Sequence, residues 1–98
     1  MTTRKESEWR VQFHKALANP VRLEIVDFLS DGEQCQCDVF RKLARPQSVI
    51  SSYLNQMTRA GILTFRRDGT RKMYRIRSPE VESLIHQIRD LARESTGK

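Results

Sequence analysis

The chain lacks the apolar segments that would place it in a membrane or send it for export. None of its apolar runs is longer than three residues, as at positions 16–18, whereas a membrane-spanning helix needs about 20. The first ten residues, MTTRKESEWR, contain no apolar core of the kind found in signal peptides. We therefore expect a cytoplasmic protein that does not associate with membranes.

Cysteine is scarce as well. Cys35 and Cys37 are the only two cysteines among the 98 residues, and a single residue separates them. In a reducing cytosol, paired cysteines more often bind metals or sense redox state than cross-link a fold. Because thiolates are soft ligands that prefer soft or thiophilic ions, this pair is the candidate metal-binding or redox site of the chain.

The usual sequence signals of catalysis are also missing. The sequence has no glycine-rich phosphate loop, no acidic cluster for a catalytic metal, and no Cys–His pair in a catalytic context. We therefore expect a protein that is not an enzyme.

Positive charge, in contrast, is abundant and concentrated. The chain has 18 Lys and Arg against 12 Asp and Glu, a formal net charge of +6. Residues 66–77 contain six of the basic residues and only one acidic residue, so this segment carries a net +5. A basic segment of this density favours a polyanionic partner.

The apolar pattern predicts a mostly α-helical single domain over residues 1–98, with its core within about residues 6–93. The expected helices cover residues 9–17, the segment from Pro20 to a stop at Gly32, residues 35–44, the segment from Gln47 to Gly61, and the segment from Ser78 to Leu91. Asn19 and Ser78 are the expected N-caps of the second and the last helix. The helix from Gln47 is expected to bury Ile50, Leu54 and Met57, and the last helix carries an apolar stripe of Val81, Leu84, Ile85, Ile88 and Leu91. Two strands, 62–67 and 72–77, are expected to flank an Asp68–Gly69 turn. The strand residues expected to face inward are Leu63, Phe65, Tyr74 and Ile76.

The helix expected from Gln47 has a polar but nearly uncharged outer face. The positions opposite its apolar stripe are Gln47, Ser48, Ser51, Ser52, Asn55 and Gln56. Hydroxyl and amide groups can donate to and accept from base edges in a major groove. The short helix before it, joined through a turn at Pro46, completes a helix-turn-helix candidate. The basic hairpin that follows can reach the phosphates beside the groove, so the combination predicts a protein that binds double-stranded DNA.

Several segments resemble the ArsR/SmtB family of winged helix-turn-helix repressors. They are ALANPVRLEIVDFL, the CxCD box at residues 35–38, QSVIS-x-YL, AGIL and RRDGTRKMY. The resemblance implies a homodimer built on the first and last helices, a recognition helix at about residues 47–59, and a repressor that an inducer releases from operator DNA. The sequence departs from the family pattern at Tyr53, where His is frequent, and at Pro46, where a small polar residue is common.

With this resemblance, two groups of DNA-contacting residues are expected on an imperfect palindrome. Those near base edges are Gln47, Ser48, Ser51, Ser52 and Tyr53, and those on phosphates are Arg67, Arg71 and Lys72.

In the family, cysteines of the CxCD box bind arsenite, antimonite or heavy divalent ions. We expect Cys35 and Cys37 to bind As(III) or Sb(III), because these ions need only two or three thiolates. Cd(II) or Pb(II) is less favoured, since residues 1–34 contain no further cysteine. On a regular helix the two thiols would point about 200° apart, so they can share one ion only if the first turn is distorted or not yet helical.

Two alternatives stay open. The same cysteines could form a thiol redox or persulfide switch, or the chain could be a winged-helix regulator with no metal inducer.

Overall fold

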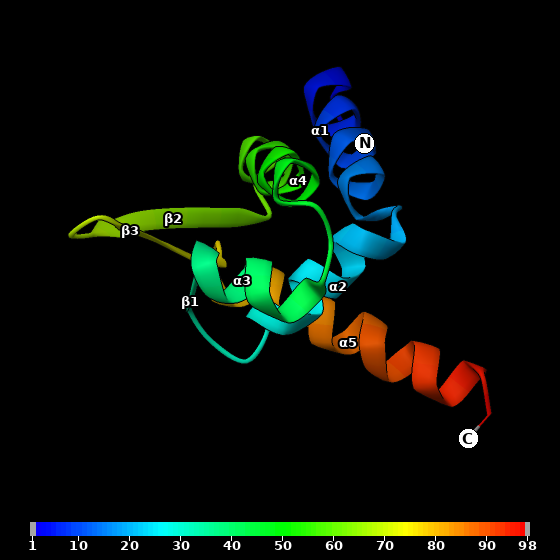
Figure 1. Cartoon of the computed structure of the whole chain (residues 1–98). Coiled ribbons are helices and arrows are strands. Elements are labelled where there is room, and N and C mark those ends of the chain that lie inside the picture. Colours follow the sequence, from blue (N-terminus) through cyan, green and yellow to red (C-terminus); the bar gives the residue numbers. More distant parts are fainter. Residues whose placement is uncertain (1, 98) are drawn as a thin grey trace.

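The computed structural model describes residues 2–97 as five helices and a small sheet (Figure 1). In chain order the elements are α1 Arg4–Leu17, α2 Pro20–Leu29, β1 Gln34–Cys35, α3 Gln36–Leu43, α4 Gln47–Arg59, β2 Leu63–Asp68, β3 Arg71–Ile76 and α5 Pro79–Ser95. The strands form an antiparallel sheet in the order β1-β3-β2. No helix within the described residues has both the length and the apolar character to cross a membrane.

Side-chain caps define where the helices begin. The Asn19 side-chain oxygen accepts the backbone N–H groups of Val21 and Arg22, at 2.8 and 3.1 Å. Ser78 caps α5 by accepting the Val81 N–H at 3.2 Å. Each cap precedes a proline in the first turn, where its missing N–H needs no partner. Both caps were predicted from the sequence and are confirmed.

The core lies where α2, α3, α4 and the sheet meet. The apolar stripe predicted for α4 is confirmed, because Ile50, Leu54 and Met57 are fully buried. Around this stripe the core cluster contains Phe13, Ala16, Ile25, Val26, Leu29, Val39, Ile62, Leu63, Tyr74, Ile76 and Ile85.

One prediction about the hairpin was wrong. Phe65 was expected to face the core with Leu63, but it is 40% exposed. The strand β2 is an edge strand of the sheet, so Phe65 lies at the border of the core, whereas its partner Tyr74 on the central strand β3 is fully buried. Tyr74, paired opposite Phe65, and the ammonium group of Lys72, 4.3 Å from the ring centroid, contact Phe65 instead.

The strand β1 also departs from the prediction. Residue 35 was expected to open a helix, whereas Gln34 and Cys35 pair with Tyr74 and Met73 of β3. Cys35 is both the end of β1 and the N-cap of α3. The cysteine segment is therefore joined directly to the hairpin as well as to α3.

Helices α1 and α5 leave apolar side chains uncovered. Of the stripe predicted along α5, Ile85 is buried in the core and Val81 packs against it. Leu84, Ile88 and Leu91 are 40%, 48% and 62% exposed, and Trp9 of α1 is 50% exposed.

Candidate nucleic-acid interface and cysteine site

A tight turn sets the position of α4 relative to α3. Ala44 adopts a left-handed conformation with φ 47°, which is uncommon for a residue other than glycine and reverses the chain within a few residues. Arg45 ties the turn to α2 through an ion pair with Glu24 at 3.1 Å. The Pro46 carbonyl accepts the N–H groups of Val49 and Ile50, so α4 begins directly after the turn.

The exposed face of α4 is a narrow polar strip. It consists of Gln47, Ser48, Ser52, Asn55 and Arg59, all of which are exposed. Helix α4 contains no acidic residue, so nothing on it would repel a polyanion. Asn55 and Arg59 were not among the predicted DNA contacts, although helical spacing places them on the same face as Ser48 and Ser52.

Two predicted contact residues lie at the flanks of α4 and touch neighbouring helices. Ser51 is half-buried, and its hydroxyl accepts from the Gln36 side chain of α3 at 3.4 Å. Tyr53 is half-buried on the α2 side, where its hydroxyl accepts from Asn19 at 3.4 Å and Arg22 lies 4.5 Å from its ring centroid. These contacts fix α4 against α2 and α3.

The hairpin presents several cations along its edge. Arg67 faces Lys72 across the two strands, and like charges in such a pair repel each other. Arg67 and Arg71 are exposed and form no ion pair within residues 2–97, although Asp68 lies opposite Arg71 in the strand register. A polyanion lying along the hairpin would relieve this repulsion.

Arg66 differs from these cations because it is neutralised within the chain. Its guanidinium group donates twice to Glu33, at 2.8 and 2.9 Å. These hydrogen bonds and the positive charge of Arg66 lower the pKa of Glu33, and the same contacts raise the pKa of Arg66. Arg66 therefore anchors the segment before β1 to the hairpin.

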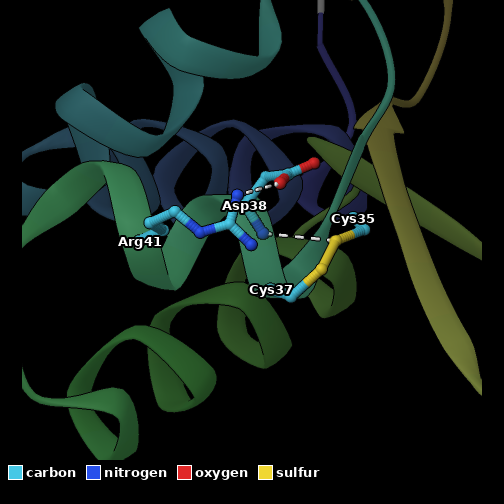
Figure 2. The surroundings of a disulfide bond; sticks show 4 residues. All are labelled: Cys35, Cys37, Asp38 and Arg41. Atoms are coloured by element: carbon cyan, nitrogen blue, oxygen red, sulfur yellow. Dashed lines mark hydrogen bonds and ion pairs between the residues drawn. A yellow bond between two sulfur atoms is a disulfide. The ribbon is translucent and has the colours of Figure 1, made fainter.

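The two cysteine side chains converge at the start of α3 (Figure 2). Cys35 has an extended backbone, φ −75° and ψ 154°, and its sulfur accepts the Asp38 N–H at 3.2 Å. Because Cys35 precedes the helix, the two sulfurs meet and are joined as a disulfide across Cα atoms 5.2 Å apart. The condition for the two thiols to share one ion, a first turn that is not yet helical at Cys35, is met in this arrangement. Cys35 is buried, whereas Cys37 is exposed.

A carboxylate completes a possible ligand set. The sulfurs of Cys35 and Cys37 and a carboxylate oxygen of Asp38 all lie within 4.8 Å of one another. Asp38 also forms an ion pair with Arg41 at 3.0 Å. Once the disulfide is reduced, two thiolates and one oxygen would suit a small thiophilic ion. The sequence contained this signal in the CxCD spacing, but Asp38 was not singled out.

The cysteine site and the basic hairpin line the same groove. Its volume is about 440 Å³. The lining residues are Cys35, Gln36, Cys37, Phe40, Arg67, Thr70, Arg71 and Lys72. Three predicted phosphate contacts and both predicted inducer ligands are therefore brought together, although they lie at least 30 positions apart in the sequence.

Comparison with known proteins places this geometry among transcriptional regulators. The family described as "Bacterial regulatory protein, arsR family" matches residues 19–64. An HTH-type transcriptional regulator from Methanocaldococcus jannaschii is 34% identical, over 86% of this chain and 96% of the relative. An arsenical resistance operon repressor from Staphylococcus xylosus is 33% identical, over 83% of this chain and 77% of the relative. A probable mercury resistance operon repressor from Streptomyces lividans is 30% identical, over 86% of this chain and 67% of the relative.

Solved structures agree with the fold. The homodimeric winged helix-turn-helix DNA-binding domain of a possible ArsR-family regulator from Mycobacterium bovis superposes with a TM-score of 0.89. It is 30% identical, with 98% of this chain and 91% of that chain covered. HlyU from Vibrio cholerae superposes with a TM-score of 0.82 at 30% identity, with 91% of this chain and 97% of that chain covered.

Proposed function

Because the chain belongs to the arsR family of bacterial regulatory proteins, we propose that it acts as a homodimeric repressor that binds operator DNA and is released by a thiophilic metalloid. The observation that carries the DNA-binding part is the arrangement of α4, an exposed and nearly uncharged polar strip next to a cationic hairpin. Gln47, Ser48 and Ser52 would contact base edges, while Arg67, Arg71 and Lys72 would contact phosphates. Ser51 and Tyr53 would act at the edges of this contact and also hold α4 in place.

A homodimer is supported by the uncovered apolar surface of α1 and α5. Trp9, Leu84, Ile88 and Leu91 are each at least 40% exposed. An apolar hollow of about 290 Å³ lies between the two helices and is lined by Trp9, Arg10, Phe13, His14, Glu80, Val81 and Leu84. Pairing two such surfaces about a two-fold axis would present two α4 helices to successive major grooves, so the operator would be an imperfect palindrome.

The cysteine pair is the proposed inducer site. Cys35 and Cys37 would bind As(III) or Sb(III) as thiolates, with the Asp38 carboxylate or a hydroxide as a third ligand. The converging sulfurs support this assignment, and so do the relatives named as arsenical and mercury resistance repressors. Cd(II) and Pb(II) are less favoured, because the described cluster offers two sulfurs rather than three or four.

The position of Cys35 suggests how binding would reach the DNA surface. Its backbone pairs with Met73 of the hairpin, and its sulfur caps α3, which packs against α4. Drawing both thiolates onto one ion would remove the cap and shift the hairpin and α3 together. A tenfold loss of DNA affinity requires only about 1.4 kcal/mol of coupling.

A redox switch is the second candidate function, and the disulfide between Cys35 and Cys37 favours it. In this case oxidation and reduction of the same pair, rather than an ion, would set the affinity for DNA.

The DNA-binding assignment is tested by comparing hairpin and helix variants. Arg71→Gln should weaken binding to all duplexes and lower the salt slope by about two per dimer, because one phosphate contact per protomer is lost. Ser52→Ala should instead reduce the difference in binding affinity between the operator and unrelated duplexes. Fluorescence anisotropy across a salt series measures both quantities. Indistinguishable behaviour of the two variants would refute the assignment of helix and hairpin.

The inducer assignment is tested on the operator-bound, fully reduced protein. Arsenite should release the parent at least tenfold more readily than it releases Cys35→Ser or Cys37→Ser. Cys37→Ser retains the buried Cys35 cap, so it separates ligand loss from loss of the cap. If the protein leaves the operator only after peroxide or persulfide treatment and arsenite has no effect, the cysteine pair acts as a redox switch. Unchanged binding under all treatments would leave a regulator without either inducer.

A further inference from the structure

A second basic pocket lies on the side of α4 opposite the hairpin. In Figure 1, α4 stands between α1 and the β2–β3 hairpin. The pocket has a volume of about 370 Å³ and is formed by α1, α2 and the C-terminal half of α4. Its lining residues are Gln12, Lys15, Ala16, Arg22, Gln56, Arg59 and Ala60.

The charge of this pocket is not balanced within the chain. Lys15, Arg22 and Arg59 contribute three cations, and no carboxylate belongs to the lining. None of the three forms an ion pair with any residue in the described range 2–97. Cations gathered in a hollow without a counter-charge repel one another. An anionic ligand would relieve this repulsion.

Arg22 is the least exposed of the three cations and is held by contacts from two other helices, α1 and α4. Its Nη1 donates to the Lys15 carbonyl at 3.3 Å, and its Nη2 donates to the Gln56 side chain. The guanidinium group lies over the Tyr53 ring. Its Nε is buried and has no hydrogen-bond partner within residues 2–97. The positive charge of Arg22 is therefore fixed in place, while Lys15 and Arg59 at the rim are exposed and free to close on a ligand.

Arg59 connects this pocket to the DNA-facing strip. Ser48, Ser52, Asn55 and Arg59 follow one another at spacings of four, three and four residues, so they share one face of α4. When this strip enters a major groove, about 12 Å wide, a phosphate backbone runs along each side. The hairpin lies toward one backbone and the pocket toward the other.

We propose that the pocket of Lys15, Arg22 and Arg59 binds a backbone phosphate of the operator, on the groove side opposite the hairpin. This inference rests on the proposed DNA-binding function. A DNA phosphate is the favoured occupant over a free anion, because Arg59 belongs to both the strip and the pocket. The two basic regions would grip the major groove from both sides and fix the depth and register of α4, whereas the strip would read the bases.

The first test compares charge-removing variants at the rim with a matched control. Lys15→Gln and Arg59→Gln should each lower the salt slope by about 1.8 per dimer, so that raising salt from 50 to 200 mM costs about tenfold less affinity than in the parent. Lys5→Gln removes the same charge from the exposed N-terminal part of α1, outside the pocket, and should leave the slope within about 0.5 of the parent. Arg22 is not substituted, because it also packs on Tyr53.

The second test locates the phosphate. Neutral methylphosphonates are introduced one at a time along both operator strands, and affinities are measured for the parent and for Arg59→Gln. The parent should lose affinity at one phosphate per half-site that lies across the groove from the phosphates sensitive to Arg71→Gln. Arg59→Gln should be insensitive at that phosphate only.

The outcomes separate this inference from the function on which it rests. Failure of the parent to bind any duplex would refute the proposed function itself. Normal binding with no phosphate that couples to Arg59, or equal salt slopes for all three variants, would refute the phosphate site alone. Tight binding of inorganic phosphate to the DNA-free protein, together with no coupling, would assign the pocket to a small anion and also overturn the inference.

Discussion

Helices α4 and α5 carry apolar stripes of the same helical spacing, yet the chain treats them differently. In α4, Ile50, Leu54 and Met57 are all fully buried against residues of the same chain. In α5, only Ile85 is buried, and Leu84, Ile88 and Leu91 remain largely exposed. Periodicity therefore identifies a face that must be covered but does not say whether the cover comes from the same chain.

The same contrast applies to the charges of the hairpin. Arg66 is neutralised by Glu33 through two hydrogen bonds. Arg67 and Arg71, on the same two strands, form no ion pair in the part of the chain that the structure describes. Groups that are satisfied internally hold the fold together, whereas those left open indicate where a second chain or a polyanion would bind.

The largest effect on stability is expected from truncating a side chain in the buried apolar stripe of α4. Leu54→Ala should lower the free energy of unfolding by about 2–5 kcal/mol, because it leaves a cavity in a fully buried site. Urea denaturation followed by circular dichroism measures this loss, which should be independent of protein concentration once the dimer is saturated. Leu23→Ala is the control, since Leu23 is a 47% exposed leucine on α2. A loss below about 1 kcal/mol at Leu54 would contradict the comparison.

A smaller effect, on dimer formation, is expected from truncating a side chain in the exposed apolar stripe of α5. This effect should depend on protein concentration. Ile88→Ala removes a side chain of which about half remains exposed, worth about 1 kcal/mol per protomer if a partner covers it. Two protomers lose about 2 kcal/mol, so the dimer dissociation constant should rise roughly 30-fold. Sedimentation equilibrium gives this constant.

A control on the same helix sharpens that measurement. Gln87 is exposed next to Ile88, and its side chain donates to Ser83 on the same helix. Gln87→Ala should leave the dimer constant unchanged. Equal effects of the two substitutions, or a parent that is monomeric at micromolar concentration, would mean that α5 is not the dimer surface.

Much of the local structure was predictable because its causes are local. The caps at Asn19 and Ser78, the buried stripe of α4 and the Asp68–Gly69 turn each depend on residues within one turn of chain. The exposed strip of α4 followed from the same spacing.

The remaining features depend on contacts between distant segments. Strand β1 has two residues, too few for any periodicity, and it exists because β3 offers partners at Tyr74 and Met73. Which flank of α4 is covered depends on where α2 and α3 pack, so the contacts of Ser51 and Tyr53 were not foreseeable. The pocket around Arg22 likewise combines three helices that the sequence alone does not place side by side.

The smallest expected effect concerns Arg66, the hairpin arginine that forms an ion pair with Glu33, and it depends on pH. The hydrogen bonds from Arg66 hold the pKa of Glu33 below its ordinary value of 4.5. A carboxyl group whose pKa is lowered by folding stabilises the fold above its ordinary value, and this contribution is lost as the pH falls through the lowered pKa. Glu33→Gln should therefore lower the melting temperature slightly at neutral pH, and the difference from the parent should shrink as the pH drops below 4.5.

Thermal melts from neutral to acidic pH, at low and high salt, test this expectation. Glu94→Gln is the matched control, because Glu94 is exposed and forms no ion pair within residues 2–97. Its difference from the parent should not change with pH in this way. High salt should reduce the effect of Glu33→Gln without abolishing it, since screening weakens the charge attraction more than the paired hydrogen bonds. If the difference in melting temperature between Glu33→Gln and the parent grew toward acidic pH, Glu33 would be held by something other than Arg66. The distinction within the described residues between the ion-paired Arg66 and the unpaired Arg67 and Arg71 would then be wrong.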